Sequence, residues 1–294
     1  MIERDDKSTT GSADGSAAGR AARPEDSPAG ERDLGADLEL ARQIADEVDQ
    51  LTMARFGAPD LVVESKPDLT PVSEADLAAE QLIRTRLSAA RPHDTVSGEE
   101  FATTGTSRWR WVLDPIDGTK NYVRGVPVWA TLIGLLDGDD AVLGVVSAPA
   151  LGRRWWAHRG GGAFGTALGA PTRRLRVSSV RDLADASLSI ASLEGWAARG
   201  RLEHLIGLTD AVWRTRGYGD FWSYMLVAEG AVDLATEAEL SLWDIAALAP
   251  IVTEAGGTFT GLNGRPGVLH GNAAASNTLL HQALLHFVGD PSAG

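Results

Sequence analysis

Two aspartates at the end of a hydrophobic segment are the first residues here that could do chemistry. The segment Trp111–Lys120, WVLDPIDGTK, places Asp114 and Asp117 around a proline and before a Gly-Thr pair. Pro115 disfavours helical backbone at the residue before it, so Asp114 is expected at the extended end of a strand. Gly118 permits a tight turn, and the residues after it can begin a helix with free N–H groups. One loop would then offer two carboxylates and an anion-binding helix start.

Carboxylates and a phosphate group repel each other, so they can share a site only with cations between them. Hard oxygen ligands beside a phosphate are typical of Mg²⁺ sites and of phosphoryl-transfer chemistry. A surface turn is the alternative for DPIDG, because Asp-Pro and Asp-Gly pairs are common turn formers. Two more acidic segments favour the metal site: GEE at 98–100 ends a strand-like run, and Asp244 begins the apolar segment LWDIAAL. A helix cap is the alternative for Asp244 alone.

Periodicity predicts the elements that position these acids. Apolar residues at helical spacing predict a helix over 34–56, and Ser73 with Asp76 predicts a capping box for a helix that ends before Pro92. LVVES, DTVSGEEF and WRWVLD are expected strands. From Val128, three β-rich runs separated by DGDD, APALG and RGGG predict an antiparallel meander. The first half is therefore expected to be α+β, with two helices and a sheet.

The second half shows alternating strand and helix patterns. ASLSIAS and VDLATE are expected strands, TRGYGD an expected loop, and the expected helices are GRLEHLIGLTDAVWR, FWSYMLVAEGA and SLWDIAALAPIVTEAGG. This alternation predicts an α/β half. We expect a disordered tail at 1–33, an α+β half with metal-binding motifs at 34–170, and an α/β half with substrate loops and the last metal ligand at 171–290. The tail is polar and charged, so it cannot bury enough apolar surface to order itself.

Composition excludes several classes of protein. The formal net charge of −13 argues against nucleic-acid binding and against an anionic membrane surface. No apolar run approaches membrane-spanning length, and the first residues lack the apolar region of a secretory signal. The chain has no cysteine, which excludes disulfides and thiolate metal sites. A cytoplasmic location is therefore expected.

Taken together, GEE at 98–100, WVLDPIDGTKNY at 111–122 and LWDIAALAPIVTEAGG at 242–257 resemble the inositol monophosphatase family of metal-dependent, lithium-sensitive phosphatases. The three motifs have the order and spacing of the family, and the resemblance runs from about Leu34 to the final helix. It implies a layered α-β-α-β-α sandwich. It also implies direct hydrolysis of a small phosphate ester by in-line attack of a metal-activated water, with two or three Mg²⁺ ions per site.

The resemblance also implies roles for individual residues. The expected Mg²⁺ ligands are Glu99, Asp114, the Ile116 carbonyl, Asp117 and Asp244. The expected catalytic residues are Glu99, Thr119 and Asp76, the last paired with Thr119. The residues expected to contact substrate are Asp117, Gly118, Thr119, Gly219, Asp220, Glu237 and Asp244. Lys66 falls near the family's third metal or active-site loop, where a supporting role is expected.

Two segments look more like the histidinol-phosphate phosphatase branch than the inositol branch: TKNYVRGVPVWATLIGL and RGYGDFWSYMLVAEGAVDLATEAELSLWD. L-Histidinol phosphate, an intermediate of histidine biosynthesis, carries an ammonium group and an imidazole that Asp220 and Glu237 could bind. A helix cap is the alternative for Asp220. Inositol 1-phosphate or a nucleoside 3′,5′-bisphosphate is the alternative substrate, and a regulatory binding protein on the same scaffold is the non-enzymatic alternative.

The remaining motifs point to packing. The tryptophans of RWRW and RRWW alternate with arginines at strand spacing, which is typical of core and cross-strand packing. The resemblance also allows a homodimer whose interface these tryptophans would line. The six histidines are scattered and show no metal-ligand spacing.

Overall fold

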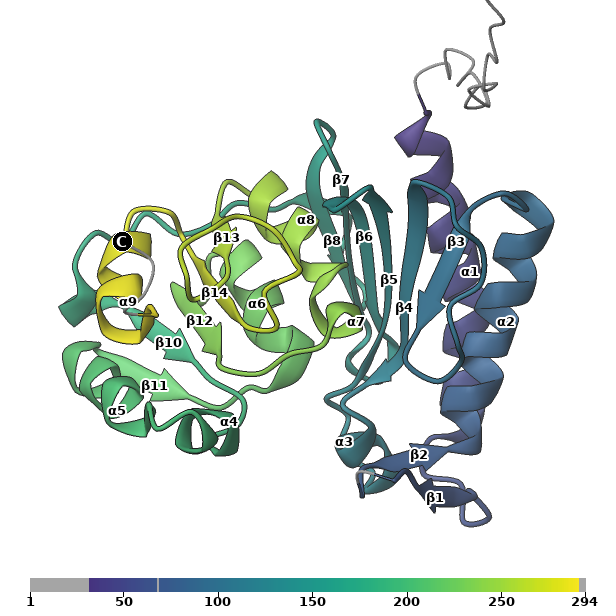
Figure 1. Cartoon of the computed structure of the whole chain (residues 1–294), viewed down its shortest axis with the longest axis horizontal. Helices are drawn as coiled ribbons and strands as arrows, with labels where there is room; N and C mark the ends of the chain where they lie inside the picture. The colour runs from purple at the N-terminus through teal and green to yellow at the C-terminus, as the bar shows by residue number, and fades with distance from the viewer. Residues whose placement is uncertain (1–31, 68, 291–294) are drawn as a thin grey trace, which may run out of the picture. The chain divides into compact units, whose positions relative to one another are not determined.

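The computed structural model describes residues 32–67 and 69–290 (Figure 1). The tail predicted at 1–33 lies outside these residues except for its last two. Asp33 caps the first helix, because its Oδ1 accepts a hydrogen bond from the Ala36 N–H at 3.0 Å. From Asp33 onward the described residues belong to one compact unit. Within the described part of the chain, no helix is both long and apolar enough to cross a membrane.

A seven-stranded sheet dominates the first half. Its strands, in spatial order, are β3 (Thr95–Gly98), β4 (Trp109–Asp117), β5 (Ala130–Asp137), β6 (Asp140–Ala148), β7 (Arg153–His158), β8 (Gly162–Ala167) and β9 (Arg173–Arg174). Only the β3–β4 pair is parallel. The predicted meander is confirmed, but it continues past its three expected strands into β8 and the short β9. The glycine-rich strand β8 was missed because its small residues give no apolar alternation.

Two helices, α1 (Leu34–Arg55) and α2 (Glu74–Ala90), cover one face of this sheet (Figure 1). Both were predicted, and the capping box of α2 is present. Ile44 and Ile83 pack with Trp111 and Trp156 in one core cluster. Trp111 and Trp155 are fully buried within the chain itself, which confirms the packing role predicted for these motifs. A hairpin, β1 (Val63–Ser65) and β2 (Pro71–Ser73), joins the two helices, and β2 was not predicted.

A five-stranded mixed sheet lies in the second half. Its spatial order is β11 (Arg214–Arg216), β10 (Ser187–Ser189), β12 (Leu234–Glu237), β14 (Ala273–Ser276) and β13 (Thr258–Thr260). The predicted strands β10 and β12 are confirmed. Strand β11 replaces the start of the loop expected at 215–220, because Arg214, Thr215 and Arg216 pair in parallel with β10. These polar residues form an edge strand, and their sequence has no apolar alternation from which a strand could be predicted.

Helices fill the middle and outer layers (Figure 1). The middle layer contains α6 (Asp220–Ala228), α7 (Leu242–Ile245) and α8 (Leu248–Glu254), and the outer layer α4 (Glu194–Ala198), α5 (Leu202–Ala211) and α9 (His281–Val288). Short helix α3 (Thr119–Val123) follows β4, and 3₁₀ turns span Pro149–Leu151 and Leu183–Asp185. The predicted α-β-α-β-α sandwich is therefore confirmed.

The helix predicted over 241–257 is in fact two short helices, α7 and α8. Pro250 has no N–H to donate to the Ala246 carbonyl, so a continuous helix would lose a hydrogen bond there. The link at Ala247 instead presses into the seven-stranded sheet at Gly144. A Cβ built on Gly144 would lie 2.0 Å from the Ala247 carbonyl oxygen. This close approach brings Asp244 at the start of α7 to the end of β4.

Candidate active site

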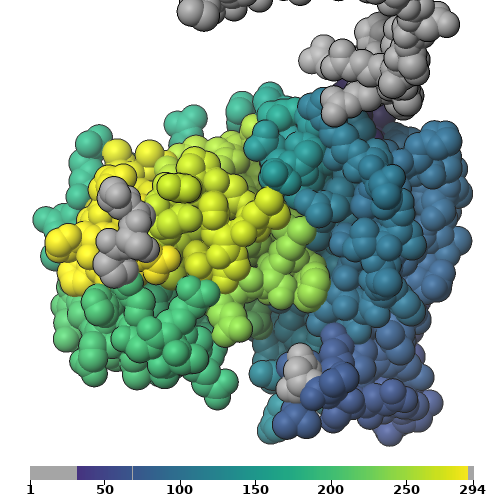
Figure 2. Space-filling model, in the orientation of Figure 1, coloured from purple at the N-terminus to yellow at the C-terminus, as the bar shows by residue number. Residues whose placement is uncertain are grey.

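A cavity of about 1070 Å³ lies where β4, α3, α6, β12 and α7 meet. It opens between hairpin β1–β2 and the segment that begins α4, where the space-filling surface is hollowed along its lower edge (Figure 2). The cavity is lined by nearly all of the predicted site residues: Lys66, Glu99, Asp114, Ile116, Asp117, Gly118, Thr119, Gly219, Asp220, Glu237 and Asp244. Asp76 does not line it, but lies fully buried behind Thr119.

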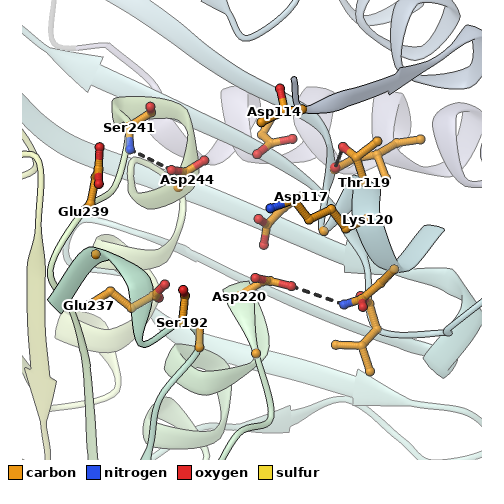
Figure 3. A pocket seen from close by; sticks show the side chains of 18 of the residues that line it. Asp114, Asp117, Thr119, Lys120, Ser192, Asp220, Glu237, Glu239, Ser241 and Asp244 are labelled. Atoms are coloured by element: carbon orange, nitrogen blue, oxygen red, sulfur yellow. Dashed lines mark hydrogen bonds between the residues drawn. The ribbon is translucent and has the colours of Figure 1, made fainter. Parts of the chain in front are cut away.

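Three of the predicted metal ligands point toward one another. Carboxylate oxygens of Asp114, Asp117 and Asp244 lie within 4.8 Å of one another, and Figure 3 shows them around a common space. Asp114 is almost completely buried, and its Oδ1 has no hydrogen-bond partner. Because a buried carboxylate oxygen without a partner is costly, this atom is suited to bind a cation or a hydrogen-bond donor. Glu99 lines the same cavity but lies outside this group of three.

A bulge in β4 explains how Asp114 and Asp117 can face one space. In a regular strand, residues three apart point to opposite faces. Here Asp114 pairs with Leu132 and Asp117 with Ala130, so three steps on β4 match two on β5. The extra residue turns Asp117 back toward the face of Asp114. Pro115 suits this irregular position because it has no N–H to pair, and its carbonyl accepts a hydrogen bond from the Thr131 hydroxyl at 2.8 Å.

Burial and mutual repulsion raise the pKa values of these acids. The pKa of Asp114 lies well above its usual value because the group is buried, and because Glu99 and Asp117 add negative charge. Burial likewise raises the pKa of Asp117, with Asp220 contributing. Burial raises the pKa of Asp244 to about 7 and that of Glu237 to about 8. Each of these carboxyl groups is therefore easier to protonate than an exposed acid.

The donor set fits Mg²⁺. Every candidate ligand is a hard oxygen, the form of donor that Mg²⁺ prefers, and four carboxylates would balance the charge of about two such ions. The candidate ligand oxygens also carry few competing contacts. Asp244 uses Oδ2 to accept from the Ser241 N–H at 2.7 Å in the capping box of α7, and Asp117 uses Oδ2 to accept from the Phe221 N–H at 2.8 Å. Each keeps its second oxygen for the cavity.

Lys66 occupies the outer edge of the candidate metal site. Its ammonium group donates to Glu99 at 2.7 Å and to Glu100 at 2.8 Å. Burial lowers the pKa of Lys66, but these two ion pairs outweigh that effect and raise it overall. Burial raises the pKa of Glu100 to about 7, against the opposing effect of Lys66. The lysine thus holds Glu99 in this structure and competes with any cation for that carboxylate.

The turn after β4 needs a glycine. Gly118 has φ 86°, in the left-handed region, and a Cβ there would lie 3.0 Å from the Val128 carbonyl oxygen and 3.2 Å from Asp220. The start of α3, residues 118–120, lines the cavity directly beside the carboxylates. The first N–H groups of a helix lack intrahelical partners and favour anions.

The opposite wall carries Asp220 and Glu237 (Figure 3). The helix-cap alternative for Asp220 is wrong: Gly219 is the N-cap residue of α6, and the Asp220 carboxylate instead accepts from the Asn121 amide at 3.3 Å. Asp220 has a positive φ of 45°, which is costly for a residue with a side chain and is common at functional sites. Oε1 of Glu237 is buried and has no hydrogen-bond partner.

Several residues that line the cavity were not predicted from the sequence. Asn121, Ser192, Glu194 and Glu239 all line the cavity. Glu239 could have been predicted, because it lies two residues after Glu237 at the end of an expected strand. Residues two apart in an extended segment point to the same face. Asn121 lies within the motif WVLDPIDGTKNY at 111–122. Ser192 and Glu194 lie in a segment without a chemical pattern, and only the packing of the second sheet brings them to the cavity.

The layered fold and the acidic cavity between its two sheets define a class of phosphatases. The chain belongs to the inositol monophosphatase family, whose model matches residues 33–289. A histidinol-phosphatase of Streptomyces coelicolor is 63% identical over 256 residues, covering 86% of this chain and 96% of that protein. A histidinol-phosphatase of Mycobacterium tuberculosis is 59% identical over 251 residues, covering 85% and 96%. The extragenic suppressor protein suhB from Bartonella henselae has a similar structure, with a TM-score of 0.79, 30% identity and coverage of 87% and 99%.

Proposed function

We propose that this chain is a Mg²⁺-dependent phosphomonoesterase that hydrolyses L-histidinol phosphate to L-histidinol and phosphate. The observation that carries the proposal is the grouping of Asp114, Asp117 and Asp244 beside the start of α3 in one cavity. An acidic cavity can accept a phosphate only with cations present, and a helix start binds its oxygens. The two relatives named histidinol-phosphatase support the choice of substrate.

The metal would be held by Asp114, Asp117, Asp244, Glu99 and the Ile116 carbonyl. When bound, Mg²⁺ supplies Lewis acidity and neutralises the charge of the phosphate and its leaving oxygen. The backbone N–H groups of Gly118 and Thr119 orient the phosphate. Thr119 donates its hydroxyl proton to Asp76 at 3.2 Å, so its oxygen can accept a hydrogen bond from the attacking water. Thr119 and Glu99 thereby aim the water at phosphorus.

The other end of the ester would lie against Asp220 and Glu237. In L-histidinol phosphate the ammonium-bearing carbon follows the ester carbon directly, and the imidazole is further away. Asp220 adjoins Phe221, whose N–H contacts the candidate ligand Asp117 at 2.8 Å, so Asp220 is placed for the nearer ammonium group. Glu237 would then accept from the imidazole. Burial raises the pKa of Glu237 to about 8, so a cationic or N–H donor bound there would favour its charged form.

The test is a comparison of phosphate release from L-histidinol phosphate, inositol 1-phosphate and adenosine 3′,5′-bisphosphate with Mg²⁺ present. We expect kcat/KM for L-histidinol phosphate to exceed that for the other two esters by about 100-fold or more. Neither of the other esters has the ammonium group, so each loses a buried charged contact. A preference for inositol 1-phosphate would overturn the substrate assignment. Binding of Mg²⁺ and phosphate without release from any ester would favour the regulatory alternative.

A further inference from the structure

The turn that carries Glu99 is held from behind by a buried carboxylate on α2. Glu80 has no exposed surface. Its Oε2 accepts from the Glu100 N–H at 2.8 Å, and its Oε1 accepts from the Phe101 N–H at 3.3 Å. A buried carboxylate that receives two consecutive backbone N–H groups fixes the backbone on which they lie. The acceptor thus sits directly behind the peptide that follows Glu99.

An arginine one helical turn later completes the contact. Arg84 Nε donates to Glu80 Oε1 at 2.7 Å, and its terminal nitrogen donates to the Phe101 carbonyl at 2.9 Å. The pair therefore binds both the N–H groups and a carbonyl of the same turn. Arg84 also balances the charge of Glu80, which makes the buried carboxylate tolerable.

The glycine of GEE belongs to the same arrangement. A Cβ built on Gly98 would lie 2.1 Å from Glu80 Oε1 and 2.3 Å from its carboxyl carbon. Gly98 has no positive φ in this structure, so its backbone conformation does not require glycine. Glycine is required at position 98 because any Cβ there would occupy the space of the Glu80 carboxylate. The motif thus combines a gap for Glu80, the candidate ligand Glu99, and Glu100, which binds Lys66.

Helix α2 connects this turn to the other side of the cavity. Asp76 precedes Glu80 by four residues, so the two carboxylates point from one face of the helix. Asp76 accepts from Thr119 on α3, while Glu80 holds the turn that follows β3. One rigid helix thereby sets the spacing between Thr119 and Glu99.

We propose that Glu80 and Arg84 are positioning residues for metal binding, because they fix the backbone that presents Glu99 to Asp114. This inference rests on the proposed Mg²⁺-dependent function but not on the identity of the ester. Outer contacts that orient metal ligands typically change metal affinity by about 10- to 100-fold when they are lost. The expected signature is weaker metal binding with a kcat that recovers when the metal is saturating.

The test uses Glu80→Gln and Arg84→Lys in the full chain. Glu80→Gln keeps the side-chain shape but turns an amide group toward backbone donors, and Arg84→Lys keeps the charge but loses the second donor. Binding of Mn²⁺, measured by electron paramagnetic resonance without substrate, should weaken by about 10-fold or more in Glu80→Gln and less in Arg84→Lys. The Mg²⁺ concentration that half-activates phosphate release should rise in parallel.

The matched control is Asp49→Asn. Asp49 is a mostly buried acid on α1 that binds Arg154 at 2.6 Å, and it does not line the cavity. Its loss should lower Tm without changing Mn²⁺ affinity. If both Glu80→Gln and Arg84→Lys lower Tm but bind Mn²⁺ like the unsubstituted chain, the pair is merely structural and the inference is wrong. If the unsubstituted chain binds Mn²⁺ but hydrolyses none of the tested esters, the proposed function fails while the Mn²⁺ comparison still decides this inference.

Discussion

The hydroxyl of Thr119 donates to Oδ1 of Asp76 at 3.2 Å, although 43 residues separate the two. The other oxygen of Asp76 accepts from the N–H and hydroxyl of Ser73 at 2.8 and 2.6 Å. One carboxylate therefore caps α2 and orients Thr119. The Ile116 carbonyl lies 3.0 Å from the same hydroxyl and competes for its proton. A cation bound at that carbonyl would leave Asp76 as the acceptor.

The first prediction concerns this hydroxyl. Thr119→Ala removes the group that orients the attacking water, so we expect kcat to fall by about 100-fold or more. Thr119→Ser keeps the hydroxyl and should retain most of the activity. Steady-state phosphate release at saturating Mg²⁺ measures both variants. Equal activity of the Ala and Ser variants would show that the hydroxyl is not used.

The second prediction concerns Asp117. Asp117→Asn keeps an oxygen for the Phe221 N–H but removes a negative charge from the candidate metal site. Mn²⁺ affinity and kcat should each fall by about 100-fold or more, while Tm without metal stays the same or rises, because a buried repulsive charge is gone. Mn²⁺ binding, phosphate release and thermal unfolding are measured on the same preparation of the variant and of the unsubstituted chain. Undiminished turnover would show that Asp117 is not a metal ligand.

The third prediction concerns pH. In the metal-free protein burial raises the pKa of Asp244 to about 7 and of Glu237 to about 8, above their unfolded values. The folded state then binds more protons than the unfolded state, so the contribution of these groups to stability falls as pH rises from about 4 to about 8. Mg²⁺ would offset that loss by pairing with carboxylates.

The gain in Tm on adding Mg²⁺ should therefore be larger at pH 8 than at pH 5.5, by about 3 °C or more. Thermal unfolding with EDTA or excess Mg²⁺ at both pH values measures it, with NaCl of equal ionic strength as the control. A gain that is the same at both pH values would contradict the assigned protonation.

The fourth prediction concerns Asp220. Asp220→Asn suits the positive φ and keeps an acceptor for Asn121, but removes the charge offered to an ammonium group. We expect KM for L-histidinol phosphate to rise by about 10-fold or more, since a charge-assisted hydrogen bond is worth about 1.5–3 kcal/mol. KM for 4-nitrophenyl phosphate, which has no ammonium group, should hardly change. A parallel rise for both esters would show that Asp220 does not select the ammonium group.

The fifth prediction compares two glycines with positive φ. A Cβ on Gly118 meets Val128 and Asp220, whereas a Cβ on Gly125, φ 72°, meets nothing within 4 Å. Both Gly→Ala variants should lose about 1 kcal/mol of stability from backbone strain. Only Gly118→Ala should also lose activity, because the start of α3 must shift. Phosphate release and urea unfolding separate the two effects, and full activity of Gly118→Ala would argue against a phosphate site at this turn.

The acidic motifs, most of the helices and strands, and the capping box of α2 follow from the amino-acid sequence alone. These features depend on local chemistry: apolar periodicity, the proline at 115, and the Ser–Asp spacing that satisfies the first N–H groups of a helix. Motif order and spacing also identified the family. Local patterns did not report the edge strand β11 or the break between α7 and α8, because sheet pairing and close packing against Gly144 decide them.

Which side chains meet in the cavity depends on how distant parts of the chain pack together. The Asn121–Asp220 contact joins residues 99 positions apart, and the Asp117–Phe221 contact joins residues 104 positions apart. Glu80 reads in the sequence as one more polar residue of a helix, yet it is buried against the turn that carries Glu99. Such contacts depend on how the layers pack and on the bulge of β4, which turns Asp117 toward Asp114. A periodic pattern says which face a residue occupies, whereas packing decides what that face meets.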